Sequence, residues 1–223
     1  MRISAIIPAY NAELFLGEAI NSALDQSRPP DEIVVVNDGS TDNTADVMYE
    51  YGPAVHQVSQ ANAGIGAARN RGLAEATGDW IAFLDADDVW LRDSLAARVA
   101  AIQASSDVVV GLTEEFQHDD RLSGLAVPAI ASAVSARIAG AMIIRRSLFD
   151  RVGGFDESLR VGETMDWVAR ASESGGRFAM VDAVVLRRRL HGANTVVRER
   201  ASQGDYLKVL RASIARRAAT REG

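Results

Sequence analysis

Cysteine is absent from the 223-residue sequence. Its absence excludes disulfides, thiolate metal sites and cysteine nucleophiles, and it fits a reducing cytoplasm. Glycine and proline, with 18 and 5 residues, are too few for a fibrous or disordered chain. Positive charge is also in deficit, since the formal net charge is −6. We therefore expect a globular, cytoplasmic protein that does not bind nucleic acid.

Long apolar runs are missing as well. No uninterrupted segment approaches the ~20 residues that span a bilayer. The first apolar stretch is short and cut by Pro8, so we expect no signal peptide. Any membrane contact should then be peripheral, at the inner membrane face. The composition, 48% hydrophobic and 24% charged, predicts one domain with an ample core.

Strand-like and helix-like segments alternate through the first half of the chain. The strand-like segments Ile3–Ile7, Glu32–Val36 and Trp80–Leu84 are apolar apart from Ser4 and Glu32, as expected for parallel strands covered on both faces. Between them, apolar residues recur at the spacing of helices that pack back on a sheet. This order predicts an α/β fold with a mostly parallel, Rossmann-like open sheet and helices on both faces.

Polar residues follow three of the predicted strands. Pro8–Tyr10 follows the strand Ile3–Ile7, Asn37 and Asp38 follow Glu32–Val36, and Asp85–Asp88 follows Trp80–Leu84. In open parallel sheets, ligands bind beyond the carboxyl ends of the strands. The sequence therefore predicts a ligand site where these three segments converge.

Three carboxylates, Asp85, Asp87 and Asp88, lie within four residues of one another. Their mutual repulsion at the end of a buried strand is unfavourable, and a divalent cation such as Mn²⁺ or Mg²⁺ would offset it. Mg²⁺ is typically held by one or two carboxylates together with substrate phosphates. The alternative is structural: Asp87 or Asp88 caps the helix that follows.

Three further residues have a functional and a structural interpretation. Asp38 can accept hydrogen bonds from a nucleobase or ribose, or it can cap the next helix, as can Ser40. Arg69 opens a helix beside the expected cleft, where its donors suit a base edge or a phosphate; otherwise it forms a solvated ion pair. His191 follows a strand and is either a metal ligand or an ordinary loop residue.

Four segments, taken together and in order, carry a family resemblance: IIPAYN, VVVNDGSTDNT, NAGIGAARNRGLAEATGDWIAFLDADD and GAMIIRRSLFDRVGGFDESL. The chain resembles family-2 glycosyltransferases of the GT-A fold over about its first three quarters. The resemblance implies a single GT-A domain. It also implies a nucleotide-sugar donor, usually linked to UDP, and transfer with inversion to a hydroxyl of a saccharide, lipid-linked or peptide acceptor.

The resemblance also assigns roles to residues. Pro8, Ala9 and Tyr10 correspond to the nucleoside pocket, with Asp38 and Arg69 close to the base. Asp85, Ala86 and Asp87 correspond to the DxD motif, whose first Asp faces the ribose and whose second ligates the metal. His191 stands where some relatives supply a further metal ligand. The region around Gly140 and the Gly153–Asp156 segment correspond to the acceptor-side wall.

The resemblance places the catalytic base on the acceptor side. Family members commonly carry Glu-Asp where this chain has Glu163-Thr164, and that Asp is often the base. We expect Glu163 to take the role, because it precedes the predicted helix and its side chain can reach the cleft. Asp166 is the second candidate, although the positive end of the helix would lower its pKa. It can also simply satisfy backbone donors there.

Two other functions remain open. A sugar-phosphate nucleotidyltransferase also needs a nucleotide-binding α/β sheet and Mg²⁺, but this sequence lacks an early glycine-rich loop followed by Arg and Lys. A degenerate family member would bind nucleotide or a partner without catalysis, as Thr164 allows. Within the domain we assign residues 1–110 to nucleotide-sugar binding, 111–200 to the acceptor side, and 201–223 to a C-terminal helix and tail.

A basic amphipathic helix is predicted over Asp205–Arg217. An apolar stripe of residues three or four apart runs along it: Tyr206, Leu207, Leu210 and Ile214. We expect this helix to dock on the surface of the domain. The alternative is an interfacial helix that meets anionic lipid, where lipid-linked acceptors are found.

Overall fold

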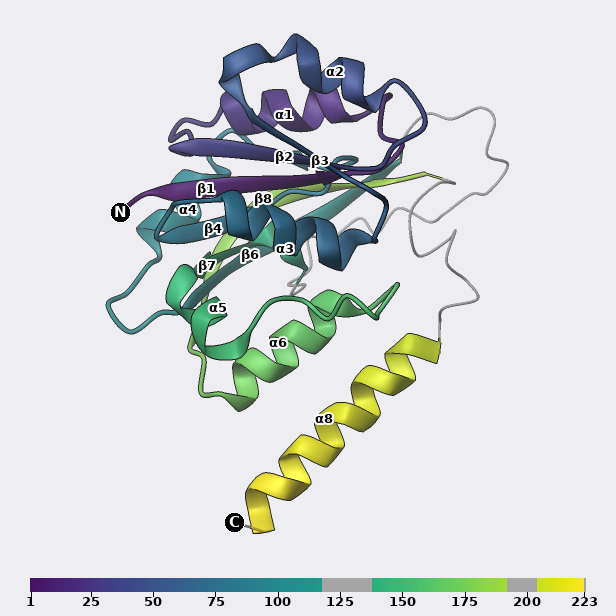
Figure 1. The fold of residues 1–223 in the computed structure, drawn as a ribbon. Helices are drawn as coiled ribbons and strands as arrows, with labels where there is room; N and C mark the ends of the chain where they lie inside the picture. The colour runs from purple at the N-terminus through teal and green to yellow at the C-terminus, as the bar shows by residue number, and fades with distance from the viewer. Residues whose placement is uncertain (118–137, 192–203, 223) are drawn as a thin grey trace.

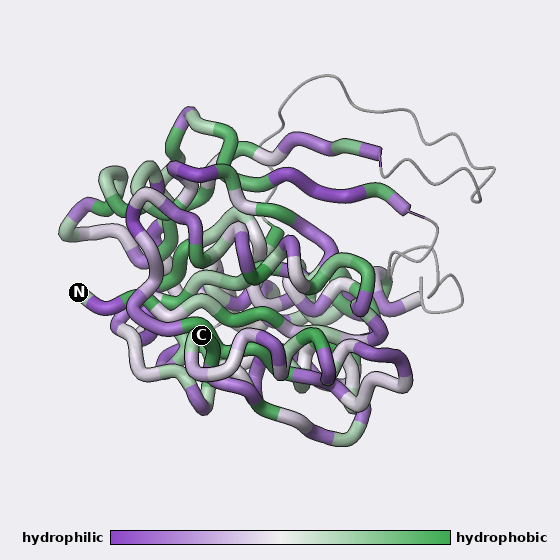
Figure 2. The backbone as a smooth tube through the Cα atoms, turned by 90° about the horizontal axis from the view of Figure 1, so that it is seen from above, coloured by the Kyte–Doolittle hydropathy of each residue, from purple (hydrophilic) through white to green (hydrophobic). Residues whose placement is uncertain are grey.

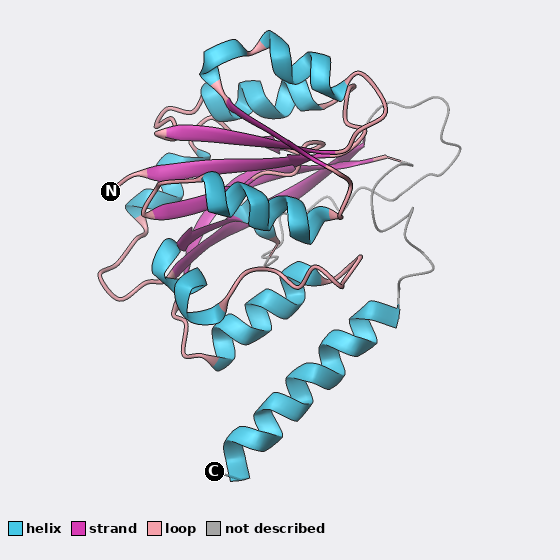
Figure 3. Cartoon of the chain, viewed as in Figure 1, coloured by secondary structure: helices cyan, strands magenta, loops and turns pink. Residues whose placement is uncertain are grey.

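The computed structural model describes residues 1–117, 138–191 and 204–222. Their strands form one eight-stranded sheet in the order β3-β2-β1-β4-β7-β6-β8-β5. Helices cover both faces of this sheet (Figures 1 and 3). The predicted α/β fold, with an open sheet and a C-terminal helix, is confirmed.

The first half of the chain contains four parallel strands and three helices. The strands are β1 (Ile3–Ala9), β2 (Glu32–Asp38), β3 (His56–Gln60) and β4 (Trp80–Phe83). The helices are α1 (Leu16–Leu24), α2 (Thr44–Glu50) and α3 (Ile65–Glu75), and a 3-10 turn, η1, spans Gly52–Ala54. Strands β1, β2 and β4 are almost entirely buried, as their continuous apolar runs predict.

The second half of the chain makes the sheet mixed. Its strands are β5 (Val89–Trp90), β6 (Val108–Gln117), β7 (Met142–Arg145) and β8 (Phe178–Leu190). Its helices are α4 (Ser94–Ala100), α5 (Arg146–Val152), α6 (Glu163–Glu173) and α8 (Gly204–Glu222), and a 3-10 turn, η2, spans Ala139–Ala141. Strand β7 pairs antiparallel with β4 and β6, while β6 and β8 run parallel. Parallel pairing between neighbouring strands is therefore most common in the first half of the chain.

Two hydrophobic clusters lie on opposite faces of the sheet. One packs α1 against β1, with Leu16 and Ile20 fully buried. The other packs α5 and α6 beneath β4 and β7 through Phe149 and Trp167. The far ends of β6 and β8 are hydrophilic instead (Figure 2), and they are joined by an ion pair of 3.0 Å between Arg188 and Glu115.

Helix α8 docks on the domain, as expected, and it lies against α6 and the loop before it. Tyr206 of the stripe packs on Gly162, and Val209 is buried. Ser213 Oγ and Arg216 Nε each donate to Glu173 at 2.6 Å. The other three residues of the stripe point outward, with exposed fractions of 57% for Leu207, 55% for Leu210 and 60% for Ile214. None of the helices in the described ranges is long and apolar enough to cross a membrane.

Helix α3 lies so close to the sheet that Gly72 leaves no room for a side chain. A Cβ at this position would stand 2.3 Å from Cγ2 of Ile6 and 3.3 Å from Cγ2 of Val36. We predict that Gly72→Ala lowers the free energy of unfolding by about 1–3 kcal/mol, as other overpacked cores do. Chemical denaturation measures the change.

Gly17→Ala is the matched control, since Gly17 also lies in a helix. Its nearest neighbour would be the Tyr51 hydroxyl at 3.4 Å, an ordinary contact. Alanine is favoured over glycine in helices by about 0.5–1 kcal/mol, so this variant should be neutral or slightly stabilised. Equal stability of the two variants would mean that α3 packs less closely than described.

Candidate active site

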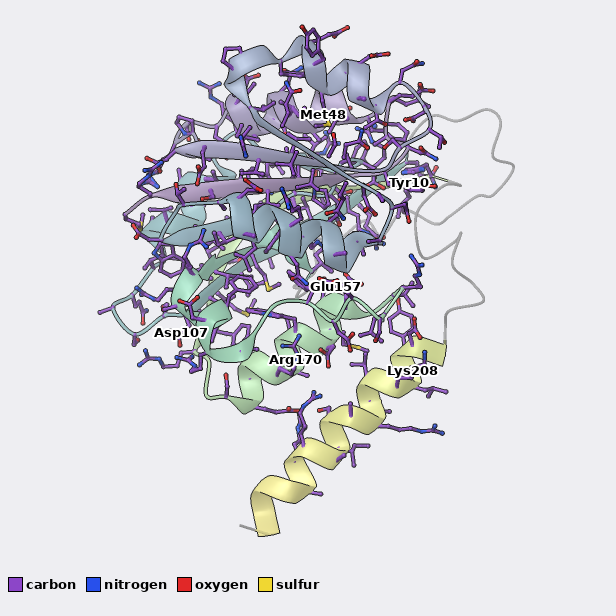
Figure 4. The ribbon with its side chains drawn as sticks, in the orientation of Figure 1. Tyr10, Met48, Asp107, Glu157, Arg170 and Lys208 are labelled. Atoms are coloured by element: carbon purple, nitrogen blue, oxygen red, sulfur yellow. The ribbon has the colours of Figure 1, made fainter. Side chains whose placement is uncertain are left out.

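A cavity of about 690 Å³ opens where the carboxyl ends of β1, β2 and β4 meet. The starts of α3, α6 and α8 complete its wall. Figure 4 shows Tyr10 at the end of β1 and Lys208 near the start of α8 on the same side of the domain. The residues predicted for the site line this cavity, with the exception of Asp166: Pro8, Ala9, Tyr10, Asp38, Arg69, Asp85, Ala86, Asp87, Glu163 and His191.

Arg69 is buried in the floor of the cavity and joins its two sides. Its Nη2 donates to Asp85 at 2.6 Å, and its Nη1 donates to Glu163 at 2.5 Å. The guanidinium also lies over the adjoining rings of Phe83 and Phe155, 6.0 Å and 5.5 Å from their centroids. Burial alone would lower the pKa of Arg69, but the two carboxylates raise it, so the group stays charged. The ion pair considered from the sequence is therefore present, but it is buried and not solvated.

The two candidate bases have different surroundings. Glu163 begins α6 and lines the cavity, where burial alone would raise its pKa. The charge of Arg69 and a hydrogen bond from Thr164 outweigh burial and lower that pKa below its ordinary value. Asp166, one turn further along α6, faces away from the cavity and pairs with Arg170 at 2.7 Å and Arg216 at 3.5 Å.

The acidic loop after β4 binds a histidine and a backbone amide. Oδ2 of Asp87 lies 3.0 Å from Nε2 of His191. Asp88 is buried and accepts a hydrogen bond from the backbone N–H of Arg189 at 2.9 Å. Burial, followed by the charges of Asp87 and Asp85, raises the pKa of Asp88 well above its ordinary value. The capping alternative is wrong, because α4 begins only at Ser94.

Asp87 and His191 fit a sparse divalent-cation site. Carboxylate oxygen and imidazole nitrogen are both ligands that Mn²⁺ accepts, and Mg²⁺ often takes one or two protein ligands with phosphates and water. Across the described residues, no group of three or more ligating side chains gathers. A cation here would therefore depend on a bound substrate for its remaining ligands.

Asp38 shapes the loop that leads into α3. Its Oδ1 accepts from Nε2 of Gln60 at 2.8 Å and from the N–H of Ala63 at 2.9 Å, while Oδ2 accepts from the N–H of Gly64 at 2.9 Å. Neither Asp38 nor Ser40 caps α2, which begins at Thr44 without a side-chain cap. The capping alternative for this segment is therefore wrong.

The sequence interpretation missed part of the wall. Arg160, Gly162 and Tyr206 line the cavity, whereas the Gly153–Asp156 segment lies outside its lining. Gly162 adopts φ 83°, and a Cβ there would stand 3.1 Å from Cδ1 of Tyr206. This contact joins α8 to the start of α6. No spacing in the sequence signals a contact between segments so far apart.

Comparison with known proteins places this site in a family. The chain is 49% identical over 113 residues to an uncharacterised glycosyltransferase from Nostoc, covering 49% of this chain and 35% of that protein. It spans between 18% and 65% of the length of five curated relatives.

Two solved structures share the fold. TarS from S. aureus, in complex with UDP-GlcNAc, has a TM-score of 0.76 at 24% identity, covering 97% of this chain and 66% of that chain. The mannosyltransferase PcManGT from Pyrobaculum calidifontis, in complex with GDP-Man and Mn²⁺, has a TM-score of 0.65 at 22% identity, covering 87% and 58%. The model of glycosyl transferase family 2 matches residues 4–153. The chain therefore belongs to glycosyl transferase family 2, with the GT-A fold of these neighbours.

Proposed function

We propose that this chain transfers a sugar from a UDP-linked donor to a hydroxyl of an acceptor, with inversion at the anomeric carbon and with a divalent cation. The observation that carries the proposal is the placement of Asp87, His191 and Glu163 around one cavity at the strand ends. Solved neighbours that hold UDP-GlcNAc and GDP-Man support a nucleotide-sugar donor. The acceptor is a saccharide, a lipid-linked molecule or a peptide.

The donor side of the cavity suits a nucleoside. Pro8, Ala9 and Tyr10 form one wall, and Tyr10 is 38% exposed and offers a ring to a base. Asp38 makes three hydrogen bonds on two oxygens. A carboxylate has about four acceptor positions, so Asp38 can also receive a donor from a base or ribose.

Asp87 and His191 would hold Mn²⁺ or Mg²⁺ through Oδ2 and Nε2. When bound, such a cation supplies charge stabilisation to the departing diphosphate. Asp85 lies beside this pair, and Arg69 holds its carboxylate at 2.6 Å. This pairing restrains the Asp85 side chain, for which we propose a contact with the ribose of the donor.

Glu163 is the proposed base because it lines the cavity, whereas Asp166 is turned away. The acceptor hydroxyl gives its proton to a Glu163 oxygen while its own oxygen bonds to the anomeric carbon. The bond from that carbon to the diphosphate oxygen breaks in the same step. Because Arg69 and Thr164 lower the pKa of Glu163, the base is weak but ionised throughout the neutral pH range.

Family membership counts against a nucleotidyltransferase. A non-catalytic binder remains the alternative, because Thr164 stands where relatives commonly carry a carboxylate. We retain the division into a donor half (1–110), an acceptor half (111–200) and a C-terminal part (201–223) as a proposal. The boundary at 110 lies inside β6, so the halves share a strand.

We extend the proposal to a peripheral contact of α8 with the inner membrane face. Leu207, Leu210 and Ile214 point to solvent, and Lys208 and Arg211 flank them. Apolar side chains bordered by cations suit the headgroup region of anionic lipid. Such a contact would bring the cavity close to a lipid-linked acceptor.

Removing the proposed metal ligand tests the donor site. We predict that Asp87→Ala loses the gain in UDP affinity that Mn²⁺ gives the wild type, a gain of about tenfold or more. Isothermal titration calorimetry with and without Mn²⁺ measures it, and circular dichroism checks the fold. Asp93→Ala is the control, because Asp93 is exposed and outside the cavity. If Mn²⁺ still raised the UDP affinity of Asp87→Ala as it does in the wild type, the metal assignment would be wrong.

Paired amide variants test the base. Glu163→Gln keeps the shape of the side chain but removes its basicity, so the transfer rate should fall about a hundredfold or more while UDP affinity stays unchanged. Asp166→Asn should weaken the pairing with Arg170 and Arg216, which lowers the melting temperature but spares transfer. Because the pKa of Glu163 is lowered, its protonation should reduce the rate only below the pH at which an ordinary glutamate titrates. Loss of transfer in Asp166→Asn alone would reverse the assignment.

Vesicle sedimentation tests the membrane contact. The wild type should pellet with vesicles of phosphatidylserine and phosphatidylcholine at low salt and be released at high salt. The double variant Leu210→Ser, Ile214→Ser should pellet several-fold less. Tyr49→Ser is the control, since Tyr49 is 80% exposed on α2. If the wild type stays in the supernatant at low salt, the membrane contact is wrong.

A further inference from the structure

Arg160 reaches the cavity from the loop that precedes α6. It lines the cavity wall, and its Nη1 lies 3.1 Å from the position of a Cβ on Gly64. Gly64 in turn donates its N–H to Asp38 at 2.9 Å. The guanidinium of Arg160 therefore lies beside the donor half of the cavity, although its backbone belongs to the acceptor side.

Arg160 differs from the other cationic and imidazole groups of the cavity. Arg69 is paired with Asp85 and Glu163, Arg188 with Glu115, and His191 lies against Asp87. Within the described part of the chain, the guanidinium of Arg160 forms no ion pair or hydrogen bond. Among the cationic groups that line the cavity in the described residues, Arg160 is therefore the one whose charge no protein carboxylate neutralises.

Helix α8 fixes the backbone of this loop. The N–H of Arg160 donates to Oδ2 of Asp205 at 2.9 Å. The ring of Tyr206 packs on Gly162, two residues further along. Both contacts come from a segment beyond residue 153, where the family match ends. The position of Arg160 therefore depends on a part of the chain outside the matched core.

We propose that Arg160 binds the diphosphate of the donor, and that Asp205 is the positioning residue that holds it over the donor half. The inference rests on the proposed function, in which the donor is a nucleoside diphosphate sugar. Acidic side chains crowd the cavity: Glu13, Asp38, Asp42, Asp85, Asp87, Asp88 and Glu163. A dianionic ligand entering such a cavity needs cationic partners, and a planar guanidinium suits phosphate oxygens.

Calorimetry with UDP and with uridine, in EDTA, separates the phosphate contact from contacts to the nucleoside. Arg160→Gln should bind UDP about tenfold more weakly than the wild type, with uridine affinity unchanged and a smaller salt dependence of UDP binding. Arg71→Gln is the control, because it removes the same charge from an exposed ion pair with Glu75 on α3.

Two other results of this titration would overturn the inference. Equal UDP affinity in Arg160→Gln and the wild type would remove the contact, and an equal loss for UDP and uridine would assign Arg160 to the nucleoside. If the wild type bound no nucleoside diphosphate, the proposed function would fail together with this inference.

Variants of Asp205 test the positioning role. Asp205→Ala removes the acceptor for the Arg160 N–H, so it should weaken UDP binding several-fold and leave uridine binding unchanged. Asp205→Asn keeps an oxygen in place and should restore UDP affinity. Melting temperatures control for the fold. If the Ala and Asn variants bound UDP as the wild type does, Asp205 would have no positioning role.

Discussion

The buried guanidinium of Arg69 is the interaction on which the cavity depends. It is only 2% exposed, and burying an arginine is costly unless its charge is paired and hydrogen-bonded. Asp85 and Glu163 offset this cost from opposite sides, one at the end of β4 and the other at the start of α6. The bridge therefore fixes the distance between the donor half and the acceptor half. Two aromatic rings, from Phe83 and Phe155, exclude water around it.

The same bridge limits the chemistry of Glu163. A carboxylate that must neutralise a buried arginine is held in place and ionised, but its pKa is lowered. A base with a low pKa takes a proton less readily. Where a family member carries a second carboxylate beside this Glu, the structural and catalytic roles can be divided. In this chain Thr164 donates its hydroxyl to Glu163 at 2.9 Å and accepts from Nη1 of Arg69 at 3.0 Å. It carries no carboxylate, so Glu163 would have to serve both roles.

Much of this arrangement could be predicted from the sequence. The strand ends at Asp38 and Asp85 follow continuous β-branched or apolar runs, and parallel strands bring such ends to one edge of a sheet. What could not be predicted depends on long-range geometry. Arg69 was expected to meet a ligand, but its partners Asp85 and Glu163 come together only in the folded chain. The docked face of α8 was also missed, because it combines Tyr206 and Val209 with polar bonds to Glu173 on α6, and an apolar pattern does not show polar partners.

The role of α8 follows from where the shared core ends. The family match stops at residue 153, yet the cavity is incomplete without Tyr206 and the loop that Asp205 holds. The loop that α8 holds at Arg160 and Gly162 runs directly into Glu163, which is one end of the Arg69 bridge. Helix α8 therefore supports the proposed donor contact of Arg160 and the proposed base from the same side of the cavity. A change in how α8 docks should reach both residues, because only the backbone of residues 160–163 separates them.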